Sequence, residues 1–226
     1  GFLARKSKAD RIAAFMEKGT ADRQLLVALH ELTLGKPFEE IILDEYQKIT
    51  PDNARRLYLD ISTMHQFGVV ARAGAISRVS GVRFSDFEND FFLPLSDIVS
   101  VVDDRYTGDK GYVCRHARVA QIVFGEACPS DTEKSEQLER ILSGLDIAYS
   151  SDERIIESIC KGRAIAEQFS HIDHARNIFE MACGIAPHSA FIFQQAAILE
   201  YTHRHGSLDR AFELATEARS IDDSNH

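Results

Sequence analysis

The spacing of apolar residues predicts a run of amphipathic helices in the first third of the chain. In residues 9–18, apolar side chains recur at Ile12, Phe15 and Met16, and the pattern stops at Gly19. The same helical spacing, each time bounded by a turn or capping residue, predicts further helices over 21–34 and 37–49. Thr50-Pro51 supplies a cap and a proline at the first position of another helix, which continues through Leu57 to Met64.

The predicted elements become shorter after Gly68. Residues 72–80 form a short helix closed by Gly81, and Ser85 with Glu88 forms a capping box that opens a third helix continuing to Leu95. The β-branched run 98–102, a turn at 108–111 and a return over 112–114 predict a β-hairpin. Helix, short helix, helix and hairpin is the layout of a winged helix, which we place over residues 53–128.

A break at Cys128-Pro129 separates two parts of different charge. Before it comes a helix over 115–127, and after it a second capping box, Ser130 with Glu133, opens a helix predicted to continue to about Tyr149. Residues 1–128 carry a net charge of −1, whereas 129–226 hold 9 basic and 17 acidic residues, net −8. We therefore expect a helical domain over 1–52, the winged helix over 53–128 and an acidic helical module over 129–226.

The acidic module contains an internal repeat. Residues 174–187 align with 210–223 at a constant offset of 36, which pairs Ala175 with Ala211, Ala182 with Ala218, and Ile185 with Ile221. Small residues seven apart on a second helix allow close packing against a first helix, here predicted over 152–169 and 188–204. This pattern resembles the tetratricopeptide (TPR) repeat. The predicted fold class is thus mainly α: a helical domain, a winged helix with a β-hairpin, and TPR-like antiparallel helix pairs.

Composition limits the class of protein. The chain has 226 residues, of which 44% are hydrophobic, so it can build a core. No apolar run approaches the roughly 18–20 residues of a membrane span, and residues 1–8 lack the apolar centre of a signal peptide. A first residue Gly1 without Met is typical of a cleaved tag or a fragment boundary. The spacing of the four cysteines fits neither a zinc nor a thioredoxin site, so we expect free thiols in a cytoplasmic protein.

Motifs for catalysis and metal binding are missing from the sequence. There is no G-x-S-x-G, H-E-x-x-H or G-x-G-x-x-G, and Gly35-Lys36 lacks the upstream glycine of a phosphate-binding loop. The pairs His171/His174 and His203/His205 have no local third ligand, so we interpret them as solvated, structural histidines near turns between helices. The sequence assigns no catalytic residue, no metal site and no enzymatic activity to this chain.

Charge also argues against a nucleic-acid partner. The third predicted helix carries Asp86, Glu88 and Asp90, which would face the phosphate backbone unfavourably. The basic residues around the predicted winged helix are few: Arg72, Arg78, Arg83, Arg105 and Lys110. These charges disfavour a DNA partner.

The segment 112–124 offers the clearest candidate site. Arg115-His116 stands where the last strand of the hairpin meets the next helix. A helix N-terminus attracts anions, so together with Arg115 and His116 it would form a receptor for a phosphate group. The structural alternative is a solvated Arg115 and a His116 packed against the hairpin.

The same segment resembles a stretch of bacterial STAND-type signalling NTPases. Tyr112, Arg115, His116, Ala120 and Phe124 fit the pattern Y-x-x-R-H-x-x-[IV]-A-x-x-[IV]-F, and the predicted domain order is similar to the region that follows the NTPase core. The resemblance places His116 at the histidine of the Met-His-Asp motif, which contacts the β-phosphate of ADP in the resting state. The chain departs from that motif with Arg115 before the histidine and Ala117 after it. Arg115 and His116 are thus the implied nucleotide-binding residues.

The resemblance also implies a function. The chain would be the regulatory and sensor portion of a STAND-like NTPase switch in bacterial, often antiphage, defence, with the NTPase core before residue 1. The chain itself would need no cofactor, and ADP or ATP would bind the full-length protein. The implied partners are a protein ligand on the repeats, the parent's NTPase domain and, on activation, further copies of the protein. Two alternatives stay open: a free-standing TPR-type adaptor and a winged-helix DNA-binding regulator.

Overall fold

The structure, a computed structural model, describes residues 7–9, 37–103 and 110–224, in two units, Gly1–Ile49 and Thr50–His226. The helices predicted over 9–18 and 21–34, Arg105 and part of the predicted turn at 108–111 lie outside the described residues. In the first unit, α3 (Phe38–Lys48) begins directly after Pro37 and buries Phe38, Ile41 and Ile42. This confirms the helix predicted over 37–49.

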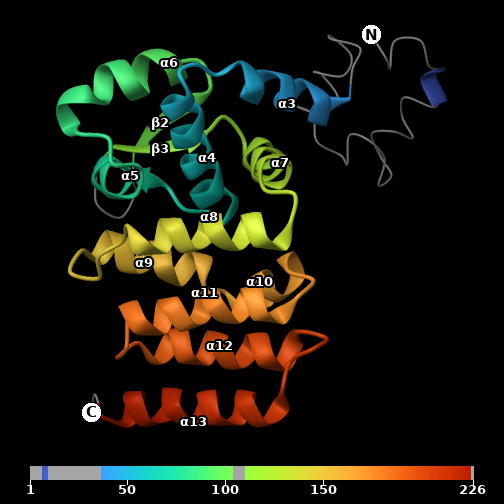
Figure 1. Cartoon of the computed structure of the whole chain (residues 1–226), viewed down its shortest axis with the longest axis vertical. Coiled ribbons are helices and arrows are strands. Elements are labelled where there is room, and N and C mark those ends of the chain that lie inside the picture. The colour runs from blue at the N-terminus through green and yellow to red at the C-terminus, as the bar shows by residue number, and fades with distance from the viewer. Residues whose placement is uncertain (1–6, 10–36, 104–109, 225–226) are drawn as a thin grey trace. The chain divides into compact units, whose positions relative to one another are not determined.

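The second unit is organised around α4 (Asp52–Gln66), which packs against α7 (Ala117–Ala127), α5 (Ala73–Ser80) and β3 (Lys110–Cys114). Helical spacing places the buried apolar side chains of α4 on more than one face, because neighbours surround it (Figure 1). These side chains are Ala54, Leu57, Tyr58, Ile61 and Met64. The helices predicted from Pro51 and over 72–80 are both confirmed, each shortened by one residue at its start. Pro51, predicted at the first helical position after a Thr50 cap, is itself the N-cap of α4.

A small antiparallel sheet lies beside α4. Its strands β1 (Ala71–Arg72), β2 (Val99–Asp103) and β3 lie in the order β1-β3-β2, with Val101 opposite Tyr112. The predicted hairpin is confirmed as β2 and β3. Strand β1 was not predicted, because two residues are too few to show an alternating pattern. The chain therefore runs helix, strand, helix, helical segment, hairpin.

The third predicted helix is broken, which corrects the capping-box interpretation of Ser85 and Glu88. The chain forms a 3₁₀ turn, η2 (Phe84–Asp86), then a π-helical turn, η3 (Glu88–Phe92), and a single α-turn, α6 (Leu93–Leu95). The Ser85 hydroxyl donates to the Asp86 carboxylate instead of capping a helix. Pro94 has no amide hydrogen and its ring would clash with the carbonyl four residues earlier, so a wider turn precedes it.

Two further predicted helices are interrupted. The capping box of Ser130 and Glu133 is confirmed, but α8 (Asp131–Ser143) ends well before Tyr149. At Gly144 an added Cβ would lie 2.7 Å from Val79 Cα, so the chain turns there against α5. The helix predicted over 152–169 is split into α9 (Ser150–Ile159) and α10 (Gly162–Gln168), because Gly162 approaches the Gln195 backbone and donates to its side chain.

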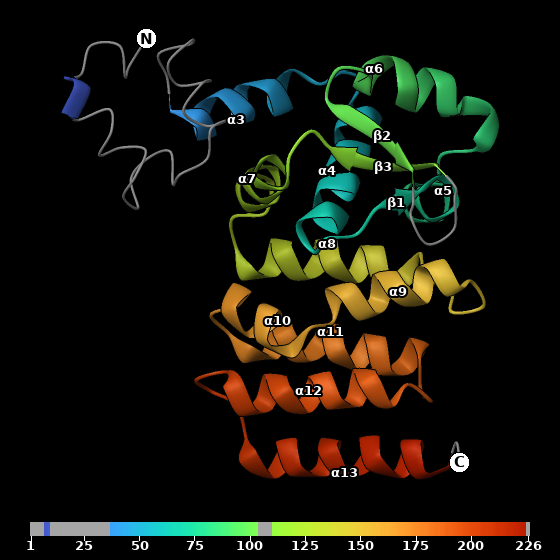
Figure 2. The same cartoon turned by 180° about the vertical axis from the view of Figure 1, so that it is seen from behind.

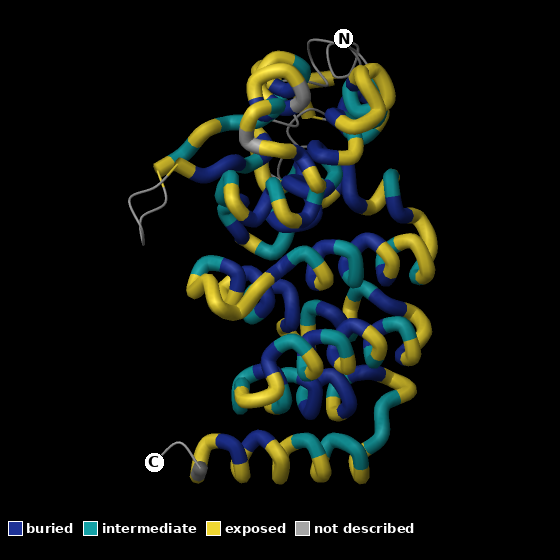
Figure 3. Tube along the Cα trace, turned by 60° about the vertical axis from the view of Figure 1, so that its left-hand side comes forward, coloured by how far each residue is buried: buried dark blue, intermediate teal, exposed yellow. Residues whose placement is uncertain are grey.

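The last three helices form successive layers. They are α11 (Ile172–Ile185), α12 (Ala190–Thr202) and α13 (Leu208–Ser224), and they lie below α8 and α10 in both views (Figures 1 and 2). The small repeat residues Ala175, Ala182 and Ala218 are buried. Figure 3 shows that the side of α13 turned away from α12 is exposed.

Helices α8 and α9 are tied to α4 and α5 by two ion pairs with buried carboxylates, which we call the junction. Asp60 of α4 has a fully buried side chain and accepts hydrogen bonds from Arg140 and Gln137 of α8. Asp152 of α9, equally buried, accepts from Arg78 of α5, whose guanidinium also lies 4.5 Å from the centre of the Tyr149 ring. Charged groups this far from water persist only when their partners are close.

All four cysteines are free, and burial raises the pKa of each thiol. For Cys114 in β3 the pKa rises to about 11, and for Cys160 after α9 to about 12. These thiols are therefore protonated and unreactive near neutral pH. In the part of the chain that the structure describes, no helix is both long enough and apolar enough to cross a membrane.

Candidate functional site

The two site residues predicted from the sequence lie together where β3 passes into α7. Cys114 ends the strand and is buried, with its sulfur 3.2 Å from the Ser62 hydroxyl of α4. The next two residues, Arg115 and His116, are exposed. Helix α7 begins at Ala117, so both site residues precede the helix that was predicted to start at Arg115.

His116 is the N-cap of α7. Its backbone is extended, and its Nδ1 accepts a hydrogen bond of 3.1 Å from the backbone amide of Arg118. Nitrogen Nδ1 must be unprotonated to accept this bond, so the hydrogen of the neutral ring is assigned to Nε2. The cap therefore leaves the Nε2–H group of an exposed imidazole as a donor for an acceptor outside the chain.

A second histidine belongs to this site and was missed in the sequence. His65 lies in the last turn of α4, and its pKa is lowered by burial and by the neighbouring charge of His116. Its Nδ1 is buried and has no hydrogen-bond partner. In the sequence, His65 stands next to the apolar positions of α4, which indicates partial burial. Its closeness to His116 follows only from the packing of α4 against α7.

The charge around the start of α7 favours an anion. The first turn contains no acidic residue, and the site contributes Arg115, Arg118 and the positive end of the helix dipole. Such a combination of amide donors and cationic side chains suits an oxyanion such as phosphate. Cys114 directly precedes the site, and burial raises the pKa of its thiol to about 11, so this thiol is protonated near neutral pH.

The other histidine pairs have structural partners. His171 Nδ1 lies 3.1 Å from the Asp131 carboxylate, and buried His203 places Nε2 3.1 Å from the Phe169 carbonyl while its Nδ1 accepts from the His205 amide. Burial of His203 differs from the solvated position expected for it. Within the described ranges, no group of three or more His, Cys, Asp or Glu side chains is placed to hold a metal ion.

Comparison of the chain with protein-family models, with curated proteins and with solved structures gave no match in any of the three. Arguments about function therefore rest on the site and on the fold that positions it.

Proposed function

We propose that the chain is the regulatory and sensor portion of a STAND-like NTPase switch. The observation that carries this proposal is the position of His116. It is the exposed N-cap of the helix that follows the last strand of a three-stranded sheet, and helices α8 to α13 come after it in the chain. This is the place of the Met-His-Asp histidine in the family that the sequence resembles.

The order of elements supports a winged helix. Helix α4, strand β1, helix α5, the helical segment 84–95 and the hairpin β2–β3 occur in that sequence, and the sheet order is β1-β3-β2. In this assignment α4, α5 and the broken segment are the three helices, and the hairpin strands β2 and β3 form the wing.

The layered helices support a TPR-like array. Helices α11 and α13 each follow a shorter helix across a turn. Of the four alanines of the 36-residue repeat, Ala175, Ala182 and Ala218 are buried and Ala211 is half-buried. Neighbour-to-neighbour stacking of this kind produces extended surfaces that bind proteins. We assign the array to recognition of a protein ligand.

Nucleotide would bind at the interface with the NTPase core of the parent protein. When ADP is bound there, His116 would donate from Nε2–H to a phosphate oxygen, and Arg115 would add charge beside it. A histidine that donates a hydrogen bond to ADP stabilises the closed, resting state. Loss of that hydrogen bond shifts the population toward an open state that assembles into oligomers.

The junction would carry the signal between the array and the winged helix. Arg140 and Asp152 belong to α8 and α9, while Asp60 and Arg78 belong to α4 and α5. Movement of α8 and α9 is therefore transmitted to α4, which packs against α7, the helix that His116 caps. Ligand binding on the array can therefore bias nucleotide retention. We assign this switch to bacterial antiphage defence in the cytoplasm, following the resemblance.

The test uses the complete parent protein with substitutions at His116. His116→Ala removes both the cap and the Nε2–H donor, whereas His116→Asp keeps a cap but places a negative charge toward the phosphate. Both variants should lose co-purifying ADP and should be active without ligand, as measured by nucleotide content and oligomer formation. His188→Ala, an exposed histidine in the turn between α11 and α12, is the matched control and should behave as wild type.

Two results would contradict the proposal. One is a His116→Asp variant that retains ADP and rests like the wild type. The other is a parent sequence with no phosphate-binding loop before residue 1.

A free-standing adaptor is the second candidate. Tyr201, Leu208 and Phe212 are large apolar side chains with 68–75% exposure, on α12 and α13. An adaptor needs only this surface, so Phe212→Ser should abolish partner binding while nucleotide plays no part. In the switch, by contrast, partner binding must lower ADP retention. Measuring both quantities on the same sample separates the two functions.

A DNA-binding regulator is less well supported. Of the five basic residues around the proposed winged helix, Arg78 is committed to buried Asp152 and Lys110 lies 2.5 Å from Asp103. Arg83 also has a carboxylate neighbour, Asp86. Pairing of these cations within the chain reduces the positive field that a DNA backbone requires.

A further inference from the structure

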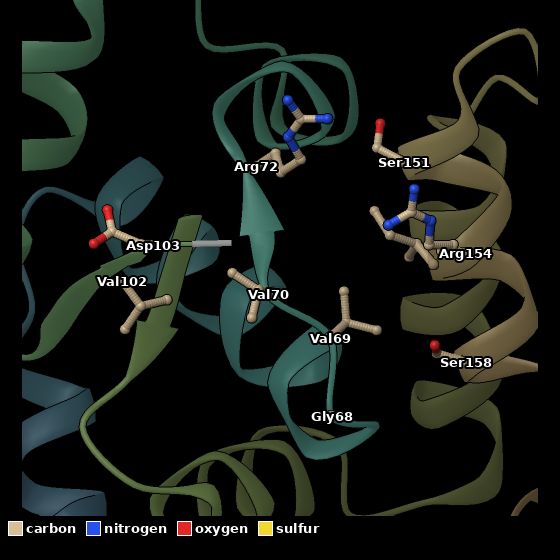
Figure 4. Close-up of a pocket in the computed structure, with 10 residues that line it drawn as sticks. Gly68, Val69, Val70, Arg72, Val102, Asp103, Ser151, Arg154 and Ser158 are labelled. Atoms are coloured by element: carbon tan, nitrogen blue, oxygen red, sulfur yellow. The ribbon is translucent and has the colours of Figure 1, made fainter. Parts of the chain in front are cut away.

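A cleft opens between the strand β1 region and helix α9, away from the start of α7. Its volume is about 410 Å³, within the range of small-molecule sites (Figure 4). One wall comes from Val69, Val70 and Arg72, and the other from Ser151, Arg154 and Ser158. The cleft therefore lies between α9 and the strands, and its lining residue Ser151 directly precedes Asp152 of the junction.

The frame of the cleft is fixed by buried groups. Val69 and Ile155 are buried and contribute apolar wall, and Gly68 adopts a φ of +77°, which allows the chain to turn sharply into Val69. Directly beside the cleft, the ion pair of Arg78 with Asp152 holds α5 against α9. The two walls are thus held apart by packed elements and by a buried ion pair.

Positive charge enters the cleft from both walls. Figure 4 shows Arg72 on the strand side and Arg154 with Ser151 on the helix side. The acidic lining residue Asp103 is paired with Lys110 at 2.5 Å. Arg72 and Arg154 each have a further interaction within the chain, but a guanidinium carries five N–H donors and can hold an oxyanion in addition.

A second hollow adjoins the first and extends the same chemistry. It has a volume of about 370 Å³ and shares Arg72 and Ser151 with the cleft. Lys110 and Tyr149 are among its further lining residues. The second hollow thus adds a hydroxyl donor and a cation next to the cleft. The valine side chains belong to the lining of the cleft itself.

We propose that this cleft binds a small organic anion, in which a phosphate or carboxylate group is attached to an apolar body. Arg72 and Arg154 hold the oxyanion from opposite walls, Ser151 donates a hydrogen bond, and the side chains of Val69, Val70 and Ile155 cover the apolar body. An occupant touches both β1 and α9 and stabilises their contact by mass action. This site is independent of His116 and of the nucleotide role proposed for it.

The test is titration of the whole chain with four probes, followed by isothermal calorimetry and thermal unfolding. Phenyl phosphate should bind saturably at one site and at least tenfold more tightly than inorganic phosphate, because only the former fills the apolar wall. Benzoate separates carboxylate from phosphate recognition, and either anion supports the proposal. Benzyl alcohol has the same apolar body without charge and should not bind at the same concentrations.

Substitutions assign the binding to the cleft. Arg72→Gln and Arg154→Gln should each weaken phenyl phosphate binding at least tenfold, whereas Arg219→Gln on exposed α13 should leave it unchanged. Ser158→Leu fills the cleft and keeps both arginines, so it should abolish binding even if an arginine variant proves unstable. Absence of saturable anion binding to the wild type overturns the proposal, as does retention of binding in Ser158→Leu or equal weakening in Arg219→Gln.

Discussion

The carboxylate of Glu200 lies between α11, α12 and α13, with 1% of its side chain exposed. Arg176 donates to both oxygens, at 2.7 and 2.9 Å, and the Ser207 amide donates at 2.9 Å. Burial alone would raise the pKa of Glu200, but these hydrogen bonds and the charges of Arg176 and Arg210 outweigh it and lower the pKa. Glu200 is therefore ionised and holds the last helices together.

Glu200→Ala should lower the free energy of unfolding by about 3 kcal/mol, near the lower end for a broken buried pair, because Arg176 keeps some access to water. Glu180→Ala is the matched control, since Glu180 binds the same Arg210 at 2.8 Å from an exposed position. Urea unfolding measures both variants. Equal losses in the two would show that burial of Glu200 contributes nothing.

His65 predicts a pH dependence of stability. Its pKa in the folded chain lies below the ordinary 6.5, so the unfolded chain binds the proton first as the pH falls. The free energy of unfolding should therefore decrease from pH 7.5 toward pH 5.5. In His65→Gln, which cannot titrate, this decrease should be smaller. Denaturant unfolding at both pH values measures the difference, and parallel profiles for the two proteins would refute the assignment.

The sequence could indicate Arg115 and His116 but could not indicate His65. A strand pattern followed by a helix pattern locates the boundary between the two elements. The basic residues Arg115 and His116 at that boundary can be identified directly from the sequence. His65 comes close to His116 only because α4 packs against α7, and the partners of such a contact are far apart in the chain.

At the scale of elements, two glycines give opposite predictions. At Gly144, an added Cβ would meet the backbone of Val79, so Gly144→Ala should lower the free energy of unfolding by roughly 1–3 kcal/mol. At Gly125 in α7 an added Cβ has open space, so Gly125→Ala should raise it by roughly 0.5–1 kcal/mol through helix propensity. Urea unfolding distinguishes them, and a shift of the same sign in both variants would contradict the close approach at Gly144.

Elements with local sequence signals could be predicted, whereas elements that depend on distant contacts could not. Helices α3, α4 and α11 were recognisable because each has an amphipathic stripe with local start and stop signals. The break at Gly144 and the split between α9 and α10 depend on distant partners, Val79 and Gln195. Strand β1 exists because β3 pairs with it, and a two-residue strand leaves no periodic trace.

At the scale of the molecule, the junction should make residues 50–226 unfold together. Cys114 lies in the sheet and Cys160 in the helical layers, and both thiols are buried. In increasing urea, the two should become reactive toward iodoacetamide at one shared midpoint, as read by peptide mass spectrometry. Asp60→Ala removes the carboxylate partner of Arg140 and should separate the two midpoints. The expected loss is about 3 kcal/mol, because Arg140 keeps access to water and its hydrogen bonds to Val79 and Gln137.

The control for this experiment is Asp52→Ala, because Asp52 pairs with Arg55 at an exposed surface and should leave one midpoint. Two midpoints in the wild type would show that the junction does not couple the parts. This coupling cannot be read from the sequence, because Asp60 and Arg140 are 80 residues apart and a composition shift at residue 128 falls between them.

The depth of the junction carboxylates has a consequence for ionic strength. At 0.5 M salt the Debye length falls to a few ångströms, which screens charges in contact with solvent but scarcely affects pairs enclosed by protein. Asp60 and Asp152 are fully enclosed, whereas an anion held by exposed Arg154 is not. Salt at 0.5 M should therefore release bound anions from the cleft, while the junction still holds α8 and α9 against α4 and α5. Dialysis against such salt would yield a folded chain without bound anion.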